Sequence, residues 1–496
     1  MQPADFTALL PFLIITATSV AVMLLIAVVR SHRWTVGLTI LGLTAAFFSL
    51  FISLRVAPRP VTPLLLVDRY ALFYIGLIVA AAAAVALFSY DYFEKKEGRR
   101  EEFYVLLLVA TLGAAVLASS SHFASFFLGL ETLSIPLFAM NAYLPDRKRP
   151  LEAGIKYLIL AAVSSAFLLF GMALIYAALG TMSFRRIASL LAGDQPMETI
   201  LILSGAVMIL TGVGFKLSLV PFHLWTPDVY EGAPAPVTAF IATVSKGAMF
   251  ALLLRAQVGA LNPTFQAAAL IPSSAAGEPG TGPIILLIAL IAAASMIAGN
   301  FLALLQSNVK RILAYSSIAQ MGYILVAFLA AGRLAIETVT FYLVTYFVTT
   351  LGAFGVVTLL SHPDRDADDI DDYRGLFWRN PLLAGIFIAM LLSLAGLPLT
   401  AGFVGKFYLV AAGASSALWT LVFILVVTSG ISVFYYLRVI VALFASRAPE
   451  AAPTVSISLL GRGLIVVLVG LLIWLGTYPT PIIRIVQAMA AGVGVG

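Results

Sequence analysis

The sequence predicts an all-α protein that crosses a membrane about fourteen times and contains two inverted five-helix repeats, each with one broken helix. Hydrophobic residues make up 61% of the 496 residues and charged residues only 10%, whereas soluble domains carry about 25% charged residues. The apolar stretches are about 18–30 residues long, which suits helices that cross roughly 30 Å of hydrocarbon. A β-barrel would need alternating segments of about ten residues, and none recur.

The predicted spans follow one another with short loops. The first begins within MQPADFTALLPFLIIT, which has no basic region and no clear cleavage site, so we expect a span rather than a removable signal. The longest polar loop, 361–381, is too short to form a domain. The predicted spans cover residues 7–29, 34–54, 70–92, 103–120, 122–144, 152–180, 197–227, 235–260, 283–306, 309–331, 335–361, 380–413, 416–446 and 458–478.

The repeat is predicted from two pairs of matching segments. Residues 151–171 align with 336–355, and residues 244–255 align with 427–438, at offsets of 185 and 183 residues. Five crossings separate the copies, and because five is odd the second copy points the opposite way, as in many ion-coupled transporters. The predicted parts are residues 1–102 (helices 1–3), 103–260 (first inverted repeat, helices 4–8), 283–446 (second inverted repeat, helices 9–13) and 458–496 (helix 14 and tail).

Two corresponding spans are predicted to be broken. Segment 197–227 would measure about 46 Å as one helix, and its Pro221 lacks an N–H and clashes with the preceding turn. Segment 380–413 contains the cluster AGLPLTAGFVGKF. A lysine lies beside each break, Lys216 and Lys406. Interrupted helices at matching places in two repeats indicate an ion site at mid-membrane; the alternative is a kink that only shapes packing.

Five charged residues lie well inside the predicted spans: Glu131, Lys156, Lys216, Lys246 and Lys406. A charge at the bilayer centre costs roughly 2.5–3.5 kcal/mol, so these groups are expected to face one another or water. Lys246 lies too deep to reach the interface.

Several of these charges also have a structural alternative. Lys156 follows Glu152 by one helical turn and could form a simple structural pair. Glu131 could cap a packing contact. Arg255 and Arg438, near span ends, are expected to extend towards the interface.

The chemistry that these residue types offer is proton transfer. Burial disfavours the charged form of a lysine and a nearby carboxylate favours it. A buried lysine whose partner moves can therefore take up and release a proton near neutral pH. We expect Glu131 paired with Lys216 to modulate such exchange, and Lys246 and then Lys406 to continue the relay through hydroxyls and water. His223 is a further candidate.

Composition excludes several other functions. The chain has no cysteine, which excludes disulfides and cysteine-ligated iron–sulfur or zinc sites. Four histidines are too few and too scattered to suggest haem or metal. There is no nucleotide-binding loop of the Walker or GxGxxG type. The net charge of +6 is explained by basic residues that flank the spans, so no nucleic-acid partner is expected. Any redox chemistry linked to this chain would lie elsewhere.

Basic residues in the short loops predict the orientation. If the N-terminus lies outside, the inner loops hold most of the loop Lys and Arg residues, including Lys95, Lys96, Arg147, Lys148 and Arg149. An even number of spans then places both termini on the outer side of the membrane.

Several long motifs resemble one known family. They are GFKLSLVPFHLWTPDVYEGAPAPVTAF, PLEAGIKY, NVKRILAYSSIAQMGY, YRGLFWRNP and SLAGLPLTAGFVGKFY. Together they resemble the antiporter-like subunit N family of bacterial respiratory NADH–quinone oxidoreductase (complex I), and the resemblance extends over essentially the whole chain. It implies a proton channel in the membrane arm of the complex, which lies in the bacterial inner membrane. Neighbouring antiporter-like and small membrane subunits would be its partners. Flavin (FMN), iron–sulfur clusters and quinone would belong to other subunits, whose quinone reduction drives the channel.

The resemblance also implies roles for individual residues. The essential glutamate of the family matches Glu131, and its three lysines match Lys216, Lys246 and Lys406. Its sixth-span pair matches Glu152 and Lys156.

One departure from the family pattern concerns the tenth span. Relatives often have a histidine where this chain has Gln320, which cannot titrate, so water or hydroxyls would have to carry a proton there.

Two other functions share some of these features. A subunit of a multisubunit Na⁺(K⁺)/H⁺ antiporter without redox coupling would show the same repeat, breaks and buried lysines. A purely structural membrane scaffold would tolerate loss of the lysines, but it would have no reason to bear the free-energy cost of burying them.

Overall fold

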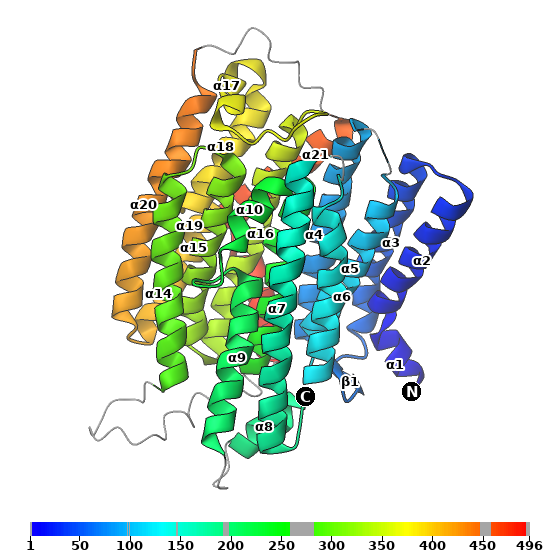
Figure 1. Ribbon diagram of the computed structural model, residues 1–496, viewed down its shortest axis with the longest axis vertical. Coiled ribbons are helices and arrows are strands. Elements are labelled where there is room, and N and C mark those ends of the chain that lie inside the picture. Colours follow the sequence, from blue (N-terminus) through cyan, green and yellow to red (C-terminus); the bar gives the residue numbers. More distant parts are fainter. Residues whose placement is uncertain are drawn as a thin grey trace.

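The computed structural model describes residues 2–96, 98, 100–144, 147–191, 198–257, 282–446 and 458–492. Its helices run roughly along the long axis of the molecule, with α2 and α3 at one edge and α14 and α20 at the opposite edge (Figure 1). The predicted span ends at 258–260 and the tail residues 493–496 lie outside the described residues.

Thirteen helices of the described ranges are long and apolar enough to cross a membrane. They match thirteen of the fourteen predicted segments. They are α2 (Leu10–Val28), α3 (His32–Ser53), α4 (Arg69–Glu94), α5 (Glu102–Ser119), α6 (Phe123–Asn141), α7 (Lys148–Leu179), α9 (Thr199–Leu217), the continuous α11–η1–α12 (Ala235–Ala256), α14 (Pro283–Leu304), α15 (Val309–Leu329), α16 (Gly332–Leu360), α20 (Trp419–Leu443) and α21 (Leu459–Thr477).

The remaining predicted segment, 380–413, forms two shorter helices, α18 (Pro381–Ala395) and α19 (Ala401–Ser415). The remaining helices are short: α1 (Pro3–Ala8), α8 (Phe184–Leu191), α10 (Trp225–Gly232), the 3₁₀ turn η4 (Ile370–Tyr373), α17 (Leu376–Arg379) and α22 (Thr480–Ala490). The all-α prediction is confirmed except for one small antiparallel hairpin of β1 (Arg59–Thr62) and β2 (Leu65–Val67). Its strands are too short for a periodic signal in the sequence.

The centre of the molecule is formed by α16, α15 and α11–α12. Every residue in the apolar window of α16 is buried, whereas most of the corresponding windows of α7 and α21 are not. Helices that are hydrophobic on all sides and buried on all sides belong to the interior of a bundle. The polar side chains of these central helices are therefore shielded from lipid by the outer helices.

The first break separates α9 from α10. Helix α9 ends at Leu217, and Ser218 adopts a left-handed conformation with φ of 62°. The indole Nε1 of Trp225, at the start of α10, donates a 3.0 Å hydrogen bond to the carbonyl of Phe215. This bond satisfies one of the carbonyls that a helix end leaves unpaired, so the break is held in place rather than frayed.

The second break separates α18 from α19 and depends on close backbone contact. Gly396 ends α18 with φ of 83°, a conformation that favours glycine. A Cβ atom on Gly402 would lie 1.9 Å from the carbonyl oxygen of Ser393. The two half-helices can approach this closely only because residue 402 has no side chain.

Gly402→Ala is therefore expected to lower the free energy of unfolding of the purified protein by about 1–3 kcal/mol, because the half-helices must move apart. The matched control is Gly430→Ala on α20, where no atom lies within 4 Å of the added Cβ. Thermal denaturation in detergent measures both. Equal melting temperatures for the two variants would contradict this explanation of the break.

Arg255, which was expected to extend towards the interface, is paired and not exposed. Arg255 in α12 is buried and forms two hydrogen bonds, of 2.9 and 2.7 Å, to the carboxylate of Asp68. Asp68 caps the N-terminus of α4 by accepting from the Ala71 amide. An arginine fork matches a carboxylate in shape and charge, so this pair joins α12 to α4 inside the bundle. Arg438, by contrast, is exposed and donates to the Leu304 carbonyl at 3.0 Å.

Candidate functional site

Lys216 lies in the last turn of α9, directly before the first break, and is buried. Its Nζ atom donates to the hydroxyls of Ser134 at 2.7 Å and Tyr157 at 3.0 Å. These partners come from α6 and α7, so three helices meet at one ammonium group. The hydroxyls solvate the charge in place of water.

The predicted direct pair between Glu131 and Lys216 is not among the ion pairs of the described residues. Glu131 lies one helical turn before Ser134 on α6, and its carboxylate accepts a 2.6 Å hydrogen bond from the hydroxyl of Ser165. Because Glu131 is only half-buried, it is not forced to find a charged partner. Residues three apart on a helix share a face, so Glu131 and the Ser134–Lys216 contact lie on the same side of α6.

Lys246 lies where the π-helical turn η1 (Ile241–Ser245) passes into α12 (Lys246–Ala256). Its side chain is completely buried, and Nζ donates to the hydroxyl of Ser317 at 2.7 Å. No carboxylate of the described chain forms an ion pair with it. Single π-helical turns occur frequently at functional sites. Lys246 is thus a buried amine whose hydrogen-bond partner, within the described chain, is a neutral hydroxyl.

Lys406 lies on α19, after the second break rather than before it. Its Nζ donates to the carbonyl of Ala395 at 2.8 Å and to the hydroxyl of Ser429 at 2.8 Å. Ala395 is the last residue of α18, where carbonyls lack partners within the helix and carry partial negative charge. The broken helix therefore supplies the group that holds the ammonium. Lys216 therefore precedes its break in the chain, whereas Lys406 follows its break.

A line of hydrogen-bonding groups extends from Lys246 towards Lys406. The Ser317 hydroxyl also bonds the hydroxyl of Tyr346 at 2.6 Å. One turn earlier on α16, the hydroxyl of Tyr342 donates to the Gln320 side-chain oxygen.

Gln320 then donates from Nε2 to the Leu394 carbonyl at 3.1 Å, next to the residue that accepts from Lys406. Ser317, Gln320, Tyr342 and Tyr346 are all buried. Gln320 therefore lies in the middle of the polar line and uses both ends of its amide.

Aromatic rings fill the space between Lys216 and Lys246. The rings of Tyr157 and Trp225 lie 4.9 Å apart, those of Trp225 and Tyr230 lie 6.4 Å apart, and the Nζ of Lys246 lies 5.6 Å from the centre of the Tyr230 ring. The Tyr230 hydroxyl is buried and forms no well-aligned hydrogen bond with the described chain. Buried polar atoms of this kind are costly unless a water bonds them. The two lysines are thus separated by rings and one polar group rather than by a continuous hydrogen-bonded line.

His223 lies between α9 and α10 and is mostly buried. Its Nδ1 atom has no hydrogen-bond partner within the described residues. The structure places it beside the first break, but no described contact joins it to Lys216.

Glu152 and Lys156 form the predicted pair on α7, with 2.6 Å between Oε1 and Nζ. Lys156 also binds Asp228 of α10 at 2.8 Å, a partner that the sequence analysis missed. These three side chains line a polar cavity of about 180 Å³ together with Arg149 and Glu231. Lys156 and Glu152 are partly exposed, so this pair lies at the surface of the chain and not among its buried groups.

A second group that the sequence analysis missed is centred on Asp366, in the loop that was expected only to connect two spans. Its buried carboxylate binds Lys310 Nζ at 2.8 Å, the Tyr92 hydroxyl at 2.6 Å and the Ala235 amide at 3.1 Å. Burial alone would raise the pKa of Asp366, but the ammonium groups of Lys310 and Lys96 outweigh it, and the pKa lies below its ordinary value. The loop is therefore tied to α4, α11 and α15 by a charged carboxylate.

Asp368, two residues later, is in the opposite situation. Burial raises its pKa to about 6, against the attraction of the Lys310 ammonium at 3.6 Å. Since aspartate ordinarily titrates near 3.9, this group can change its charge close to neutral pH. The described part of the chain holds no cluster of three or more histidine or acidic residues that suits a metal ion.

Comparison with known proteins assigns the family. Residues 120–432 match the family model described as NADH:quinone oxidoreductase/Mrp antiporter. The NADH-quinone oxidoreductase subunit N of Ectopseudomonas mendocina is 49% identical over 494 residues, which cover 97% of this chain and 96% of that protein. The subunit N of Nitrosospira multiformis is 51% identical over 507 residues, covering 98% and 97%.

Solved structures agree in fold. A chain of respiratory complex I from Thermus thermophilus, solved with bound aureothin, superposes with a TM-score of 0.79 at 34% identity, covering 96% of this chain and 98% of that chain. A chain of the Mrp complex from Dietzia sp. has a TM-score of 0.83 at 18% identity, covering 99% and 98%, and shows the fold alone. With half of its residues shared with named relatives over nearly the full length, this chain belongs to the NADH-quinone oxidoreductase subunit N family.

Proposed function

We propose that this chain transfers protons across the bacterial inner membrane as a membrane-arm subunit of NADH–quinone oxidoreductase. The observation that carries the proposal is Lys246, a completely buried amine without an acidic partner among the described residues. It bonds Ser317, and buried hydroxyl and amide groups lie between this contact and Lys406. Such a group is expensive to keep charged in an apolar interior. It suits a site that is charged in one step and neutral in the next.

The residues would act in sequence. Glu131 and Lys216 load a proton in the first half, and the charge of one alters the affinity of the other for that proton. Lys246 receives it across the gap that Trp225 and Tyr230 occupy, which requires water at the Tyr230 hydroxyl. Ser317 and Tyr346 then pass it on, since a hydroxyl can both accept and donate.

Gln320 sets a condition on the second half of the path. An amide holds Tyr342 and the Leu394 carbonyl in place but does not take up a proton itself. The proton would cross this point on water aligned by Gln320 and reach Lys406, which exchanges it with the opposite side. Glu152, Lys156 and Asp228 would admit water at the first mouth, with His223 a further candidate beside the break.

The energy for transfer would come from quinone reduction in other subunits. We propose that this chain is a non-redox subunit, and that FMN, the iron–sulfur clusters and quinone belong to its partners. Those partners include neighbouring antiporter-like and small membrane subunits. The two inverted repeats proposed for residues 103–260 and 283–446 would each hold one half of the path, with both chain termini on the periplasmic side.

A Na⁺(K⁺)/H⁺ antiporter subunit is the alternative, and its support is weaker. The family model covers both groups, but the named relatives at about half identity are subunit N proteins, and the Mrp match is at 18% identity. Purification by a tag on this chain separates the two. Co-purifying flavin, iron–sulfur clusters and NADH-driven proton uptake are expected; a tagged complex without them that exchanges Na⁺ for H⁺ would contradict the proposal.

A pair of variants at Gln320 tests the central step. Gln320→Leu should lower NADH-driven proton uptake by about five- to tenfold, because it leaves a buried hydroxyl and a carbonyl without partners. Gln320→His can still donate and accept and should retain most of the activity. Uptake is measured in inverted vesicles and normalised to the amount of assembled complex. Equal activity of the Leu variant and the parent would exclude Gln320 from the path.

A further inference from the structure

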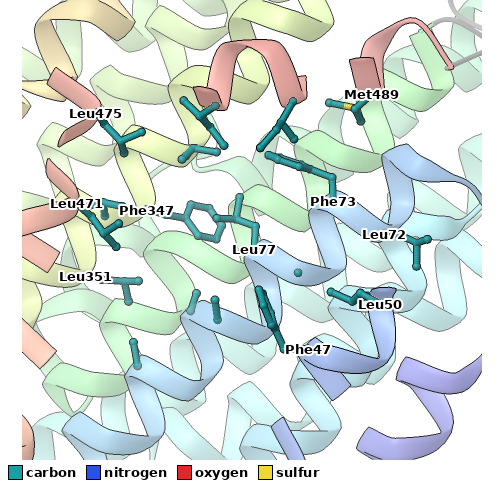
Figure 2. Close-up of a pocket in the computed structure, with 18 of the residues that line it drawn as sticks. Phe47, Leu50, Leu72, Phe73, Leu77, Phe347, Leu351, Leu471, Leu475 and Met489 are labelled. Carbon is teal, nitrogen blue, oxygen red and sulfur yellow. The ribbon is translucent and has the colours of Figure 1, made fainter. Parts of the chain in front are cut away.

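A deep apolar groove lies outside the polar path, between α3, α4, α16, α21 and α22. Its volume is about 780 Å³, within the range of roughly 300–1,000 Å³ typical of small-molecule sites. Figure 2 shows its walls, which include Phe47, Leu50, Phe73, Leu77, Phe347 and Leu471. Nearly all of the lining is hydrocarbon, so an occupant would present hydrocarbon to it.

The groove has a cationic rim at one end. Arg69, the first residue of α4, is the one charged residue among the side chains that line it. Arg55 follows the lining residue Leu54, and Arg484 precedes the lining residue Ile485. All three arginines are exposed and take part in no ion pair or side-chain hydrogen bond within the part of the chain that the structure describes.

These three arginines lie on one face of the membrane. Helix α3 ends just before Arg55, α4 begins at Arg69, and α21 ends just before α22, which carries Arg484. Successive spans alternate in direction, so the end of α3, the start of α4 and the end of α21, the last span, lie on the same side. The groove therefore combines an apolar interior with an unpaired positive charge at the level of the lipid headgroups.

We propose that this groove binds an anionic phospholipid, with its acyl chains against the apolar walls and its phosphate at Arg69. Arginine binds phosphate through two parallel hydrogen bonds, and the apolar walls accept acyl chains without burying a polar group. Arg55 and Arg484 strengthen the attraction for a headgroup with a net negative charge. The site needs no residue of the proton path.

A transmembrane helix from a neighbouring subunit is the main competing occupant. Gly76, Ala80 and Ala84 are spaced four apart on α4, a pattern that lets helices approach closely. An apolar helix would match only the walls, whereas a phospholipid matches both the walls and the rim. The charge at the rim therefore favours the lipid.

The occupant would support the helix that carries the proton path. Phe347 lines the groove, and its ring packs so closely on α12 that a Cβ on Gly247 would lie 2.4 Å from the ring. Gly247 is next to Lys246. Tyr342 and Tyr346 of the same helix α16 contact Gln320 and Ser317. The lipid would therefore pack against one side of α16 while the polar groups use another.

Two variants of the whole complex test the site. Ala80→Phe places a ring in the groove from an exposed position, and Arg69→Gln removes the rim charge. The matched controls are Ala173→Phe and Arg185→Gln, also exposed but on α7 and α8, away from the groove. Each complex is purified in detergent, delipidated and titrated with dioleoyl phosphatidylglycerol or dioleoyl phosphatidylcholine, and bound lipid is counted by mass spectrometry.

The expected result is specific to the groove and to the headgroup. Ala80→Phe should lose one tightly bound phosphatidylglycerol per complex, and Arg69→Gln should bind it about fivefold more weakly, the effect of about one interfacial charge. Both controls should bind as the parent does. Unchanged binding in both groove variants, equal binding of phosphatidylcholine, or loss of a neighbouring subunit from Ala80→Phe would overturn the proposal. A density map of the parent complex with a protein helix in the groove would overturn it as well.

Discussion

Replacement of Lys246 by alanine is expected to reduce NADH-driven proton uptake into inverted vesicles by roughly a hundredfold, to the background of the assay. A positioned proton donor or acceptor typically accelerates the step it serves by roughly 10²–10⁴-fold. The amine of Lys246 is the group that joins the first half of the path to Ser317, and the same hydroxyl bonds Tyr346. Assembly should remain near normal, because alanine leaves no unpaired charge.

Arginine at the same position should not restore pumping fully. It keeps the charge but does not release its proton near neutral pH, so a role in proton exchange and a role as a fixed charge predict different results. Lys95→Ala, at the loop end of α4 and outside the path, is the matched control and should pump normally. Full pumping by an assembled Lys246→Ala complex would contradict the role assigned to this residue.

Replacement of Arg255 by leucine is expected to have the largest effect on stability. Breaking a buried ion pair by removing one partner typically costs about 3–5 kcal/mol, because the other charge stays buried and unpaired. Asp68 and Arg255 are both only 6% exposed, so neither can turn to water. The expected result is a strongly reduced amount of assembled complex in the membrane and a lower melting temperature of what remains.

The double variant Asp68→Leu with Arg255→Leu is the control. It removes both charges, so it should be more stable than Arg255→Leu alone, although Asp68 also caps α4. A double-mutant cycle with the two single variants measures this coupling. If the double variant is no more stable than Arg255→Leu, the loss comes from packing around the arginine stem and not from a stranded carboxylate.

Much of the fold could be predicted because the bilayer imposes length and composition on each span. The long apolar segments appear as helices with ends within a few residues of the predicted limits, for example α14 at Pro283–Leu304 against the predicted 283–306. Both predicted breaks are present, since Pro221 and the Gly396–Pro398 cluster act on the local backbone. Local chemistry of this kind is readable from one sequence.

Contacts between distant segments could not be predicted in the same way. Arg255 was expected to extend towards the interface, but its buried partner Asp68 could not be predicted from its own helix. Asp228 and Asp366 lie in polar segments whose packing places carboxylates beside Lys156 and Lys310. The hairpin of β1 and β2 was missed since its register depends on pairing and not on periodicity.

In the candidate site, too, local features could be predicted from the sequence and contacts between helices could not. The lysines were found because a charge in an apolar run is conspicuous and expensive. Their partners were not found, because Ser134, Ser317 and Ser429 are ordinary small polar residues until a neighbouring helix brings an ammonium to them. Ser134 and Ser317 are 183 residues apart, the same offset as in the repeat, and each accepts from one of the buried lysines.

If the three buried lysines form one proton path, groups able to exchange protons must connect them. A density map of the whole complex, at a resolution that shows ordered water, tests it most directly. We expect water at the Tyr230 hydroxyl and beside Gln320, so that Lys216, Lys246 and Lys406 are joined by continuous hydrogen bonds. Dry packing at both places, or lysine side chains turned towards lipid, would contradict it.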